Sequence, residues 1–269
     1  MRRSNRLEQI DPPQRAERVG GGGGDEFSWT PSSLSGLMLW LDASVGVTDD
    51  STGKVLTWQD QSPAHHVAAV WSGFESPRFV PTALRGMPGL RFDGDRDRLT
   101  VPDAESLRVR LRDFVLELVV SSDLGPDLED SEGRILFSKQ NDLNWPFQGL
   151  GMYLNGHRVV AYADQGQGVL KTPLANAPFY DDARARVLGL RRRGNELSLR
   201  VNGKQLAVVP ITIDAGGEGF PVRLGGGNVG QYLQGVIAEV VLSQVEADAD
   251  VENVEHYLLT KYATALASP

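Results

Sequence analysis

The chain has no cysteine among its 269 residues, which excludes disulfide bonds and thiolate metal sites. It also lacks any uninterrupted apolar run of about 18 residues, so no membrane-spanning helix is predicted. Arginines at positions 2, 3 and 6 are not followed by an apolar segment, and we therefore predict no secretory signal peptide. Stability must come from a packed core instead of covalent cross-links.

Basic charge is also scarce, because 27 Lys and Arg residues face 35 Asp and Glu residues and give a formal net charge of -8. Nucleic acids are bound chiefly through clustered Lys and Arg, so a nucleic-acid partner is not expected. The one dense basic run, Arg191 to Arg193, comes just before an Asn-Gly turn and is interpreted as a solvated turn or strand end. The length suits one large β-sandwich.

Common catalytic and nucleotide-binding motifs are missing as well. There is no G-x-S-x-G, H-E-x-x-H or G-K-[ST] sequence. Gly225, Gly227 and Gly230 match the spacing of a dinucleotide-binding loop, but a strand pattern follows them where pyrophosphate binding requires the start of a helix. We therefore predict no nucleotide site and no catalytic residues.

Short strand patterns fill most of the chain. Residues 196–201 and 204–209 alternate apolar and polar around Asn202-Gly203, which predicts a hairpin with a type I′ turn. Further strands are predicted at 114–120, 134–137, 150–154, 158–162, 185–190 and 236–242. After them, Asp248 and Asp250 are expected to cap a C-terminal amphipathic helix. The apolar face of this helix consists of Val251, Val254, Leu258, Tyr262 and Leu266.

Two groups of motifs carry a family resemblance. Val201-Asn202-Gly203, Leu224-Gly225-Gly226 and the segment 233–240 follow one another in that order, and L-W-L-D-A, W-x-D-x-S, P-x-F and G-x-P-G-x-R-F-D-G occur between residues 39 and 94. This order resembles the laminin-G-like, concanavalin A-like jelly rolls of bacterial and phage surface proteins. The resemblance implies an all-β, two-sheet antiparallel sandwich with a short C-terminal helix. Ala238 replaces an Asp usual in the family, so no cation-binding role is carried over to it.

We divide the chain into an N-terminal arm, residues 1–26, and a jelly-roll domain, residues 27–269. The arm contains Pro12-Pro13 and five consecutive glycines at positions 20–24, which favour a flexible tether. If it docks on a protein partner, the candidate contacts are Arg2, Arg3, Leu7 and Ile10. A disordered tail or an expression remnant is the alternative interpretation.

Aromatic side chains beside amides are the candidate glycan-binding groups, because sugars stack on rings and their hydroxyls need polar partners. The candidates are Asn144, Trp145, Phe147, Gln148, Trp71 and Tyr232. The alternative is that Trp145 folds back on a sheet edge. Trp40 and Trp58 lie in apolar strand patterns and are expected in the core.

No cofactor is predicted, apart from a candidate Ca²⁺ site at Asp93, Asp95 and Asp97, where three oxygen ligands alternate in one loop. Arg96 and Arg98 would partly neutralise it, so a solvated turn is the alternative. The adjacent histidines 65 and 66 have no third ligand nearby and are interpreted as loop residues.

Related glucanases place E-x-D-x-x-E on one strand. The nearest approach here is Glu129, Asp130 and Glu132, which have the wrong spacing and lie in a polar loop pattern. A glycoside hydrolase is therefore the least favoured function.

The sequence thus favours a non-enzymatic structural or attachment protein that displays a lectin-like jelly roll. It would belong to a larger assembly such as a phage virion, docked through its arm, with cell-surface glycans as further partners. A stand-alone carbohydrate-binding lectin is the alternative. The expected location is a virion, including its exposed surface, or the cytoplasm, without membrane insertion.

Overall fold

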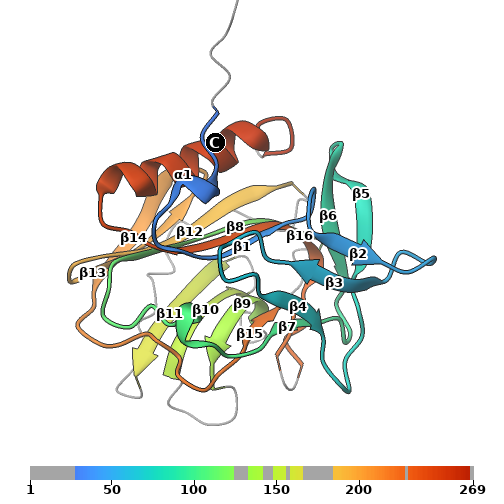
Figure 1. The fold of residues 1–269 in the computed structure, drawn as a ribbon, viewed down its shortest axis with the longest axis horizontal. Coiled ribbons are helices and arrows are strands. Elements are labelled where there is room, and N and C mark those ends of the chain that lie inside the picture. The colour runs from blue at the N-terminus through green and yellow to red at the C-terminus, as the bar shows by residue number, and fades with distance from the viewer. Residues whose placement is uncertain are drawn as a thin grey trace, which may run out of the picture.

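In the part of the chain that the structure describes, two antiparallel sheets of eight strands each form the body of the protein (Figure 1). The computed structural model describes residues 28–123, 133–141, 148–155, 158–165, 184–227 and 230–266. The first sheet, sheet A, has the order β14 (Lys204–Pro210), β13 (Glu196–Val201), β12 (Arg186–Arg193), β8 (Phe114–Ser122), β16 (Gln234–Gln244), β6 (Met87–Asp93) and β5 (Arg78–Leu84). Its eighth strand, β1 (Leu37–Asp42), pairs with the second half of β16, beyond the stretch that pairs with β6.

The second sheet, sheet B, has the order β11 (Arg158–Gln165), β10 (Gln148–Asn155), β9 (Gly133–Gln140), β15 (Val222–Leu224), β7 (Leu99–Val101), β4 (Val67–Val70), β3 (Val55–Gln59) and β2 (Val47–Asp49). Two short 3₁₀ helices, η1 (Pro31–Ser33) and η2 (Glu105–Leu107), and one α-helix, α1 (Asp248–Lys261), complete the described elements. The predicted all-β sandwich with a C-terminal helix is confirmed.

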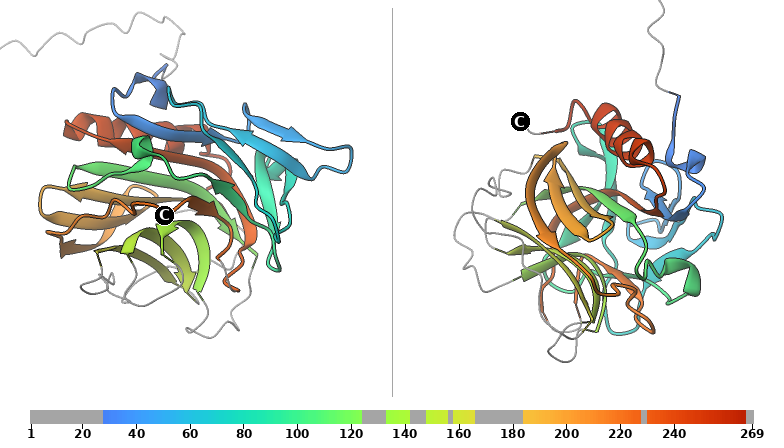
Figure 2. Two further views of the ribbon diagram at one scale, coloured as in Figure 1. Left: turned by 60° about the horizontal axis from the view of Figure 1, so that its bottom comes forward. Right: turned by 90° about the vertical axis from the view of Figure 1, so that its left-hand side faces the viewer.

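The molecule has three layers: α1, then sheet A, then sheet B (Figures 1 and 2). Strand β8 shows how the sequence produces them. Leu116 and Leu118 face the core between the sheets, whereas Val115 and Val119 belong to the cluster beneath α1. Because both faces of β8 are buried, the strand reads as an almost continuous apolar run.

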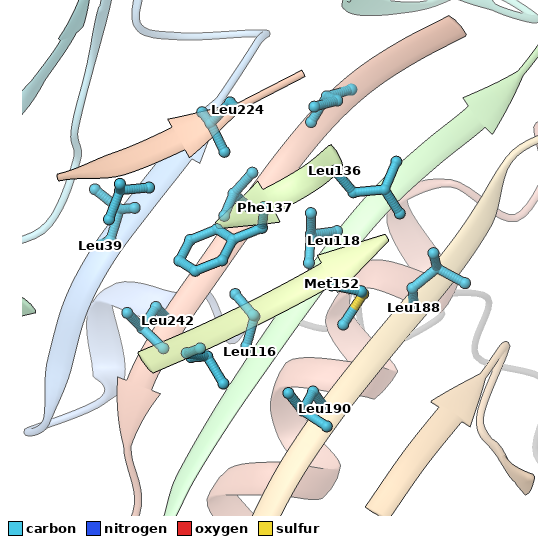
Figure 3. Packing of buried hydrophobic residues seen from close by; sticks show 14 of the residues in the cluster. Leu39, Leu116, Leu118, Leu136, Phe137, Met152, Leu188, Leu190, Leu224 and Leu242 are labelled. Carbon is cyan, nitrogen blue, oxygen red and sulfur yellow. The ribbon is translucent and has the colours of Figure 1, made fainter. Parts of the chain in front are cut away.

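The core between the sheets is built from alternating inward-facing side chains of both layers (Figure 3). Phe137 and Met152 of sheet B lie among leucines of β8, β12 and β16. Each is fully buried, and the removal of this apolar area from water supplies the main stabilising term of the fold. Trp58 is fully buried as expected, but Trp40 is only half-buried and donates its indole N–H to Glu239 Oε1 at 2.7 Å.

The predicted Asn-Gly hairpin is confirmed between β13 and β14. Asn202 and Gly203 have φ angles of 48° and 81°, as a type I′ turn requires. The turn is also held from outside, because the Asn202 side-chain oxygen accepts the Val187 backbone N–H at 2.8 Å.

Helix α1 packs its predicted apolar face on sheet A through Val251, Val254 and Leu258, all buried. The predicted capping is not formed: the N-cap is Ala247, with no side-chain cap hydrogen bond. Asp248 instead lies in the first turn with Asp250, where carboxylates complement the helix dipole. The helix ends at Lys261, so Leu266 lies beyond it and bridges to Ala185.

The arginine run also differs from its interpretation as solvated. Arg191 and Arg192 are 7% and 3% exposed within β12. Arg191 donates to Glu117 at 2.9 Å, and Arg192 donates to the Ile213 carbonyl at 2.7 Å. The two side chains lie on opposite faces of the strand, and each donates to an acceptor in another segment of the chain. The local sequence does not reveal these acceptors.

Candidate functional site

A cleft of about 210 Å³ opens where loops of both sheets meet at one end of the sandwich. Its walls come from the segment after η2, the start of β10, and the connection from β14 to β15. The lining residues are Arg108, Arg110, Gln148, Gly149, Asp214, Gly216, Gly217, Glu218 and Phe220. Residues distant in sequence therefore share one concave surface, which is the usual form of a small-ligand site.

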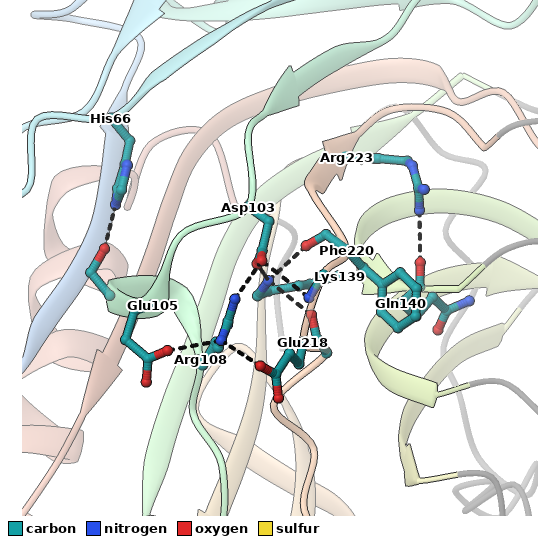
Figure 4. Close-up of polar contacts among 12 residues, drawn as sticks. His66, Asp103, Glu105, Arg108, Lys139, Gln140, Glu218, Phe220 and Arg223 are labelled. Atoms are coloured by element: carbon teal, nitrogen blue, oxygen red, sulfur yellow. Dashed lines mark hydrogen bonds and ion pairs between the residues drawn. The ribbon is translucent and has the colours of Figure 1, made fainter.

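A buried lysine holds two residues of the cleft wall in place (Figure 4). Lys139 of β9 is 1% exposed, and its Nζ donates to Asp103 Oδ1 at 2.5 Å, to the Phe220 carbonyl at 2.7 Å and to the Gly217 carbonyl at 3.1 Å. Burial lowers the pKa of this ammonium, and the hydrogen bond to Asp103 partly offsets that shift. The lysine fixes two backbone positions of the cleft wall.

Asp103 links this anchor to the rim. Its Oδ2 accepts Arg108 Nη2 at 2.7 Å and the Gly219 backbone N–H at 3.1 Å. Burial alone would raise the pKa of Asp103, but the hydrogen bonds from Lys139 and Arg108 outweigh burial and leave the pKa below its usual value. The carboxyl is therefore ionised at neutral pH and serves as a structural acceptor.

Arg108 joins three carboxylates around the rim (Figure 4). Besides Asp103, it pairs with Glu105 at 2.8 Å and Glu218 at 2.9 Å. Glu105 also pairs with Arg110 at 2.5 Å. Glu105 and Glu218 are largely exposed, so these outer pairs orient side chains and add little stability.

Two glycines are required where the walls approach the end of β9. A Cβ at Gly149 would lie 2.1 Å from the Lys139 carbonyl oxygen, and one at Gly217 would lie 2.3 Å from the same atom. Both glycines have positive φ angles. Arg110 is a non-glycine residue in the left-handed region, with φ of 53°, and strain of this kind gathers at functional sites.

The groups that face the cleft differ in chemistry. Phe220 offers a half-buried ring, Gln148 an exposed amide, and Arg110 a half-exposed guanidinium. Asp214 accepts the Gly216 backbone N–H through Oδ1 at 2.6 Å and has further acceptor capacity in Oδ2. An apolar ring beside hydrogen-bond donors and acceptors suits a hydroxyl-rich ligand.

Of the predicted glycan-binding residues, the structure places Gln148 in this cleft. Trp71 is 52% exposed but lies elsewhere, in a turn closed by a hydrogen bond from the Phe74 N–H to the Trp71 carbonyl. Tyr232 is half-buried beside Gly226. Asn144, Trp145 and Phe147 lie outside the described residues, as do the arm residues Arg2, Arg3, Leu7 and Ile10 and the acidic segment 129–132.

Sequence reasoning missed Arg108, Arg110, Asp214 and Phe220. They lie in two connections about 100 residues apart, and no local pattern joins them. The only local signal is Asp214-Ala-Gly-Gly217, a turn sequence that did not distinguish this loop from others. The topology of the sandwich alone brings the two connections together.

Two of the three candidate Ca²⁺ ligands, Asp93 and Asp97, accept backbone hydrogen bonds within their own loop. Asp97 Oδ2 accepts the Asp93 backbone N–H at 3.0 Å, and Asp93 Oδ1 accepts the Asp95 backbone N–H at 2.9 Å. In the parts of the chain that the structure describes, no three acidic or histidine side chains are grouped to hold a metal ion. The cations Lys54, Arg78 and Arg91 line a pocket with Asp93 and Asp97, which disfavours a divalent cation there.

The paired histidines, the glycine-rich loop and the helix were also interpreted from the sequence, and the structure describes residues of each. His66 contacts the Ser106 hydroxyl at 2.9 Å and has no metal-binding arrangement among the described residues. The glycines after β15 lead into strand β16, so the dinucleotide-loop geometry is absent from this described segment. No described helix combines the length and apolarity needed to cross a bilayer.

No protein-family model matches the chain, and no curated protein is similar to it in sequence. Solved structures do share its fold. The binding domain of Paraclostridial Mosquitocidal Protein 1 aligns with a TM-score of 0.60 at 15% identity, over 87% of this chain and 53% of that one.

The binding domain of botulinum neurotoxin DC in complex with SialylT aligns with a TM-score of 0.56 at 13% identity, over 78% of this chain and 51% of that one. Trypanosoma rangeli sialidase in complex with sialic acid aligns with a TM-score of 0.52 at 16% identity, over 85% of this chain and 33% of that one. The chain thus spans about half the length of the toxin domains and a third of the sialidase. At these identities the likeness establishes a shared β-sandwich fold.

Proposed function

We propose that this chain is a non-enzymatic, laminin-G-like jelly roll that binds carbohydrate in the cleft between Arg110, Gln148, Asp214 and Phe220. The carrying observation is the combination of an apolar ring, an amide, a carboxylate and a guanidinium on walls held in place by Lys139. Such walls are ordered before the ligand arrives, which lowers the entropic cost of binding.

The structural neighbours support this proposal. Two are binding domains of toxins, one of them in complex with SialylT, and the third is a sialidase in complex with sialic acid. These ligands were bound by the neighbouring proteins and not by this chain. They motivate the inclusion of sialylated glycans among the first compounds tested here.

Binding without hydrolysis is part of the proposal. A glycosidase needs one carboxyl with a raised pKa as acid and a second as base or nucleophile. Asp103, a half-buried carboxyl beside this cleft, has a lowered pKa and is held by Lys139 and Arg108. Its hydrogen bonds suit a structural role and leave it without a proton to donate at neutral pH.

The experiment is a glycan array, with and without Ca²⁺, followed by titration of any ligand found. Phe220→Ala or Gln148→Ala should weaken binding about tenfold, because stacking and a polar contact are lost. Val208→Ala and Gln205→Ala change exposed residues of β14 and are the matched controls. An array without any hit, or equal losses in variants and controls, contradicts the proposal.

We further propose that the jelly roll is an attachment part of a larger assembly, such as a phage virion, docked through residues 1–26. The motives are the tether-like composition of the arm and the resemblance to surface-protein modules. Particles from the source should carry the intact chain, and cross-links should involve the arm. If the chain is recovered only as a free monomer with an uncross-linked arm, the stand-alone lectin is the better description.

A further inference from the structure

A second pocket lies at the rim where the end of β6 meets the start of β16. Its volume is about 390 Å³, within the usual size range of small-molecule sites. It shares no lining residue with the cleft described above. The lining residues are Lys54, Ser76, Arg78, Arg91, Asp93, Asp97 and Gln234.

Among the residues that line this pocket, Asp97 is unusual because it is a buried carboxyl with few partners. It is 4% exposed, yet within the described residues it accepts one hydrogen bond, from the Asp93 backbone N–H, and forms no ion pair. A buried carboxyl normally has its acceptor capacity filled. Burial, reinforced by neighbouring Asp93, raises the pKa of Asp97 to about 6, which reflects this poor compensation.

The position of Asp97 is fixed by the backbone on both sides. Glu75 bridges to Asp97, with the Glu75 N–H donating to the Arg96 carbonyl and the Arg98 N–H to the Glu75 carbonyl, both at 3.0 Å. The Arg98 guanidinium then stacks over the Phe74 ring at 3.4 Å. These contacts fix the backbone on both sides of Asp97, and the Asp93 N–H holds Oδ2, so the position of Oδ1 is restricted as well.

The cations of the pocket are engaged elsewhere to different degrees. Lys54 pairs with Glu75 at 3.2 Å, and Arg91 pairs with Asp123. Arg78 is exposed and donates Nη1 to the Thr52 carbonyl at 2.6 Å, without a carboxylate partner among the described residues. The lining of the pocket thus includes both a guanidinium donor and a carboxylate acceptor.

This balance of charges selects a ligand class. A divalent cation is opposed by Lys54, Arg78 and Arg91, and a simple anion is opposed by Asp93 and Asp97. A vicinal diol matches both sides, because each hydroxyl can donate to a carboxylate and accept from a guanidinium, Ser76 or Gln234.

We infer that the pocket between Arg78 and Asp97 is a second subsite for a neutral, polyhydroxylated ligand, namely a sugar ring of a bound glycan. The inference deepens the proposed carbohydrate-binding function and rests on it for the source of the ligand. Two separate subsites on one domain raise the avidity for a branched or repeated glycan without any new contact at either one.

The test uses saturation-transfer NMR on the full chain with methyl α-mannoside, methyl β-galactoside and N-acetylglucosamine as probes. The reference protein is a Phe220→Ala, Gln148→Ala double variant, which removes the cleft contacts. Transfer from one of the sugars should persist in it. Adding Arg78→Gln or Asp97→Asn should then weaken the measured affinity about tenfold, because a charged hydrogen-bonding partner is lost.

Matched controls are Arg85→Gln and Asp95→Asn, which change exposed residues that do not line the pocket. Equal losses in variants and controls overturn the second subsite. Complete loss of transfer in the cleft double variant also overturns it and leaves the cleft proposal intact. Transfer that depends on Arg78 but not on Phe220 supports the subsite and contradicts the cleft assignment. Absence of transfer from all three sugars to the unmodified chain overturns the subsite.

Arg78→Gln keeps the test valid if Asp97→Asn fails to fold, because Arg78 is an exposed edge-strand residue. Proton spectra with dispersed methyl signals verify the fold of each variant before its affinity is compared.

Discussion

At the scale of single residues, Glu117 of β8 shows how burial changes the behaviour of an ionisable group. It lies fully buried under α1, where Arg191 donates to its Oε1, while Oε2 has no hydrogen-bond partner in the described part of the chain. Glu255 of α1 shares Arg191 with it and also binds Arg200. Two carboxylates and two guanidiniums thus form one largely buried network, with Arg200 at its more exposed end.

The pH dependence of stability should report on this network. Burial raises the pKa of Glu117 to about 7, despite the opposing charges of Arg191 and Arg200 and with the help of Glu255. The folded state therefore holds the proton more tightly than the unfolded chain. This contribution to stability is present below about pH 4.5 and is lost as the pH rises through 7.

Glu117→Gln should remove that loss. The free energy of unfolding of the variant minus that of the unmodified protein should rise by on the order of 3 kcal/mol from pH 5 to pH 9. Urea unfolding at each pH measures this difference. A constant difference across this range would contradict the assigned pKa.

Gly189 of β12 provides the space for the same carboxylate. A Cβ there would lie 2.6 Å from both Glu117 carboxyl oxygens. Gly189→Ala should therefore destabilise the fold by about 1–3 kcal/mol through overpacking. Combining it with Glu117→Ala should abolish the additional cost, and a double-mutant cycle by chemical denaturation measures the coupling. Strict additivity of the two changes would exclude this contact as the cause.

At the scale of elements, α1 is attached to sheet A by charge as well as by apolar packing. Lys261, its last residue, donates to Asp42 of β1 at 2.6 Å and to Glu239 of β16 at 2.7 Å. Tyr262 adds a hydrogen bond to Glu239 at 3.0 Å. Burial raises the pKa of Glu239, with Asp42 adding to the shift, and the Lys261 ammonium opposes this shift.

Lys261→Met should therefore cost about 3–5 kcal/mol at neutral pH, because two buried carboxylates lose their shared cation. The cost should shrink at acid pH, because the raised pKa of Glu239 lets this carboxyl take up a proton and lose its unpaired charge. Urea titrations at pH 5 and pH 8 measure it. Lys204→Met, at an exposed position in β14, is the control and should change stability little. Similar losses in the two variants would contradict a specific role for Lys261.

The elements also show what the sequence predicted and why. Strands with clear alternation or long apolar runs, such as β8, β13 and β14, were predicted because local pattern decides them. The three-residue strands β2 and β7 were not predicted, since only their sheet neighbours define them. The burial of Arg191 and the cleft around Phe220 likewise depend on partners from distant segments, which no single-sequence pattern contains.

At the scale of the whole molecule, the cleft depends on the correct assembly of both sheets. Lys139 belongs to sheet B, Asp103 follows β7, and Gly217 lies in the connection that leaves sheet A through β14. The binding surface is therefore an outcome of the complete sandwich and is not carried by any one loop.

Lys139→Met should uncouple these segments. It leaves Asp103 without its ammonium partner and frees the carbonyls of Gly217 and Phe220, so it should weaken carbohydrate binding even though no cleft-facing side chain is changed. Isothermal titration with a ligand found on the array measures the loss, and Lys204→Met is again the control. Unchanged affinity in a folded Lys139→Met protein would show that the anchor is dispensable.

The pairing of β1 with β16 has a consequence for biosynthesis. Leu39 lies opposite Leu242, so β1 pairs with a strand that is synthesised about 200 residues later. Sheet A cannot close before β16 is available. Contacts of such long sequence separation slow folding. The nascent β1 therefore leaves the ribosome without its β16 neighbour, and we expect sheet A to close only after β16 has been translated.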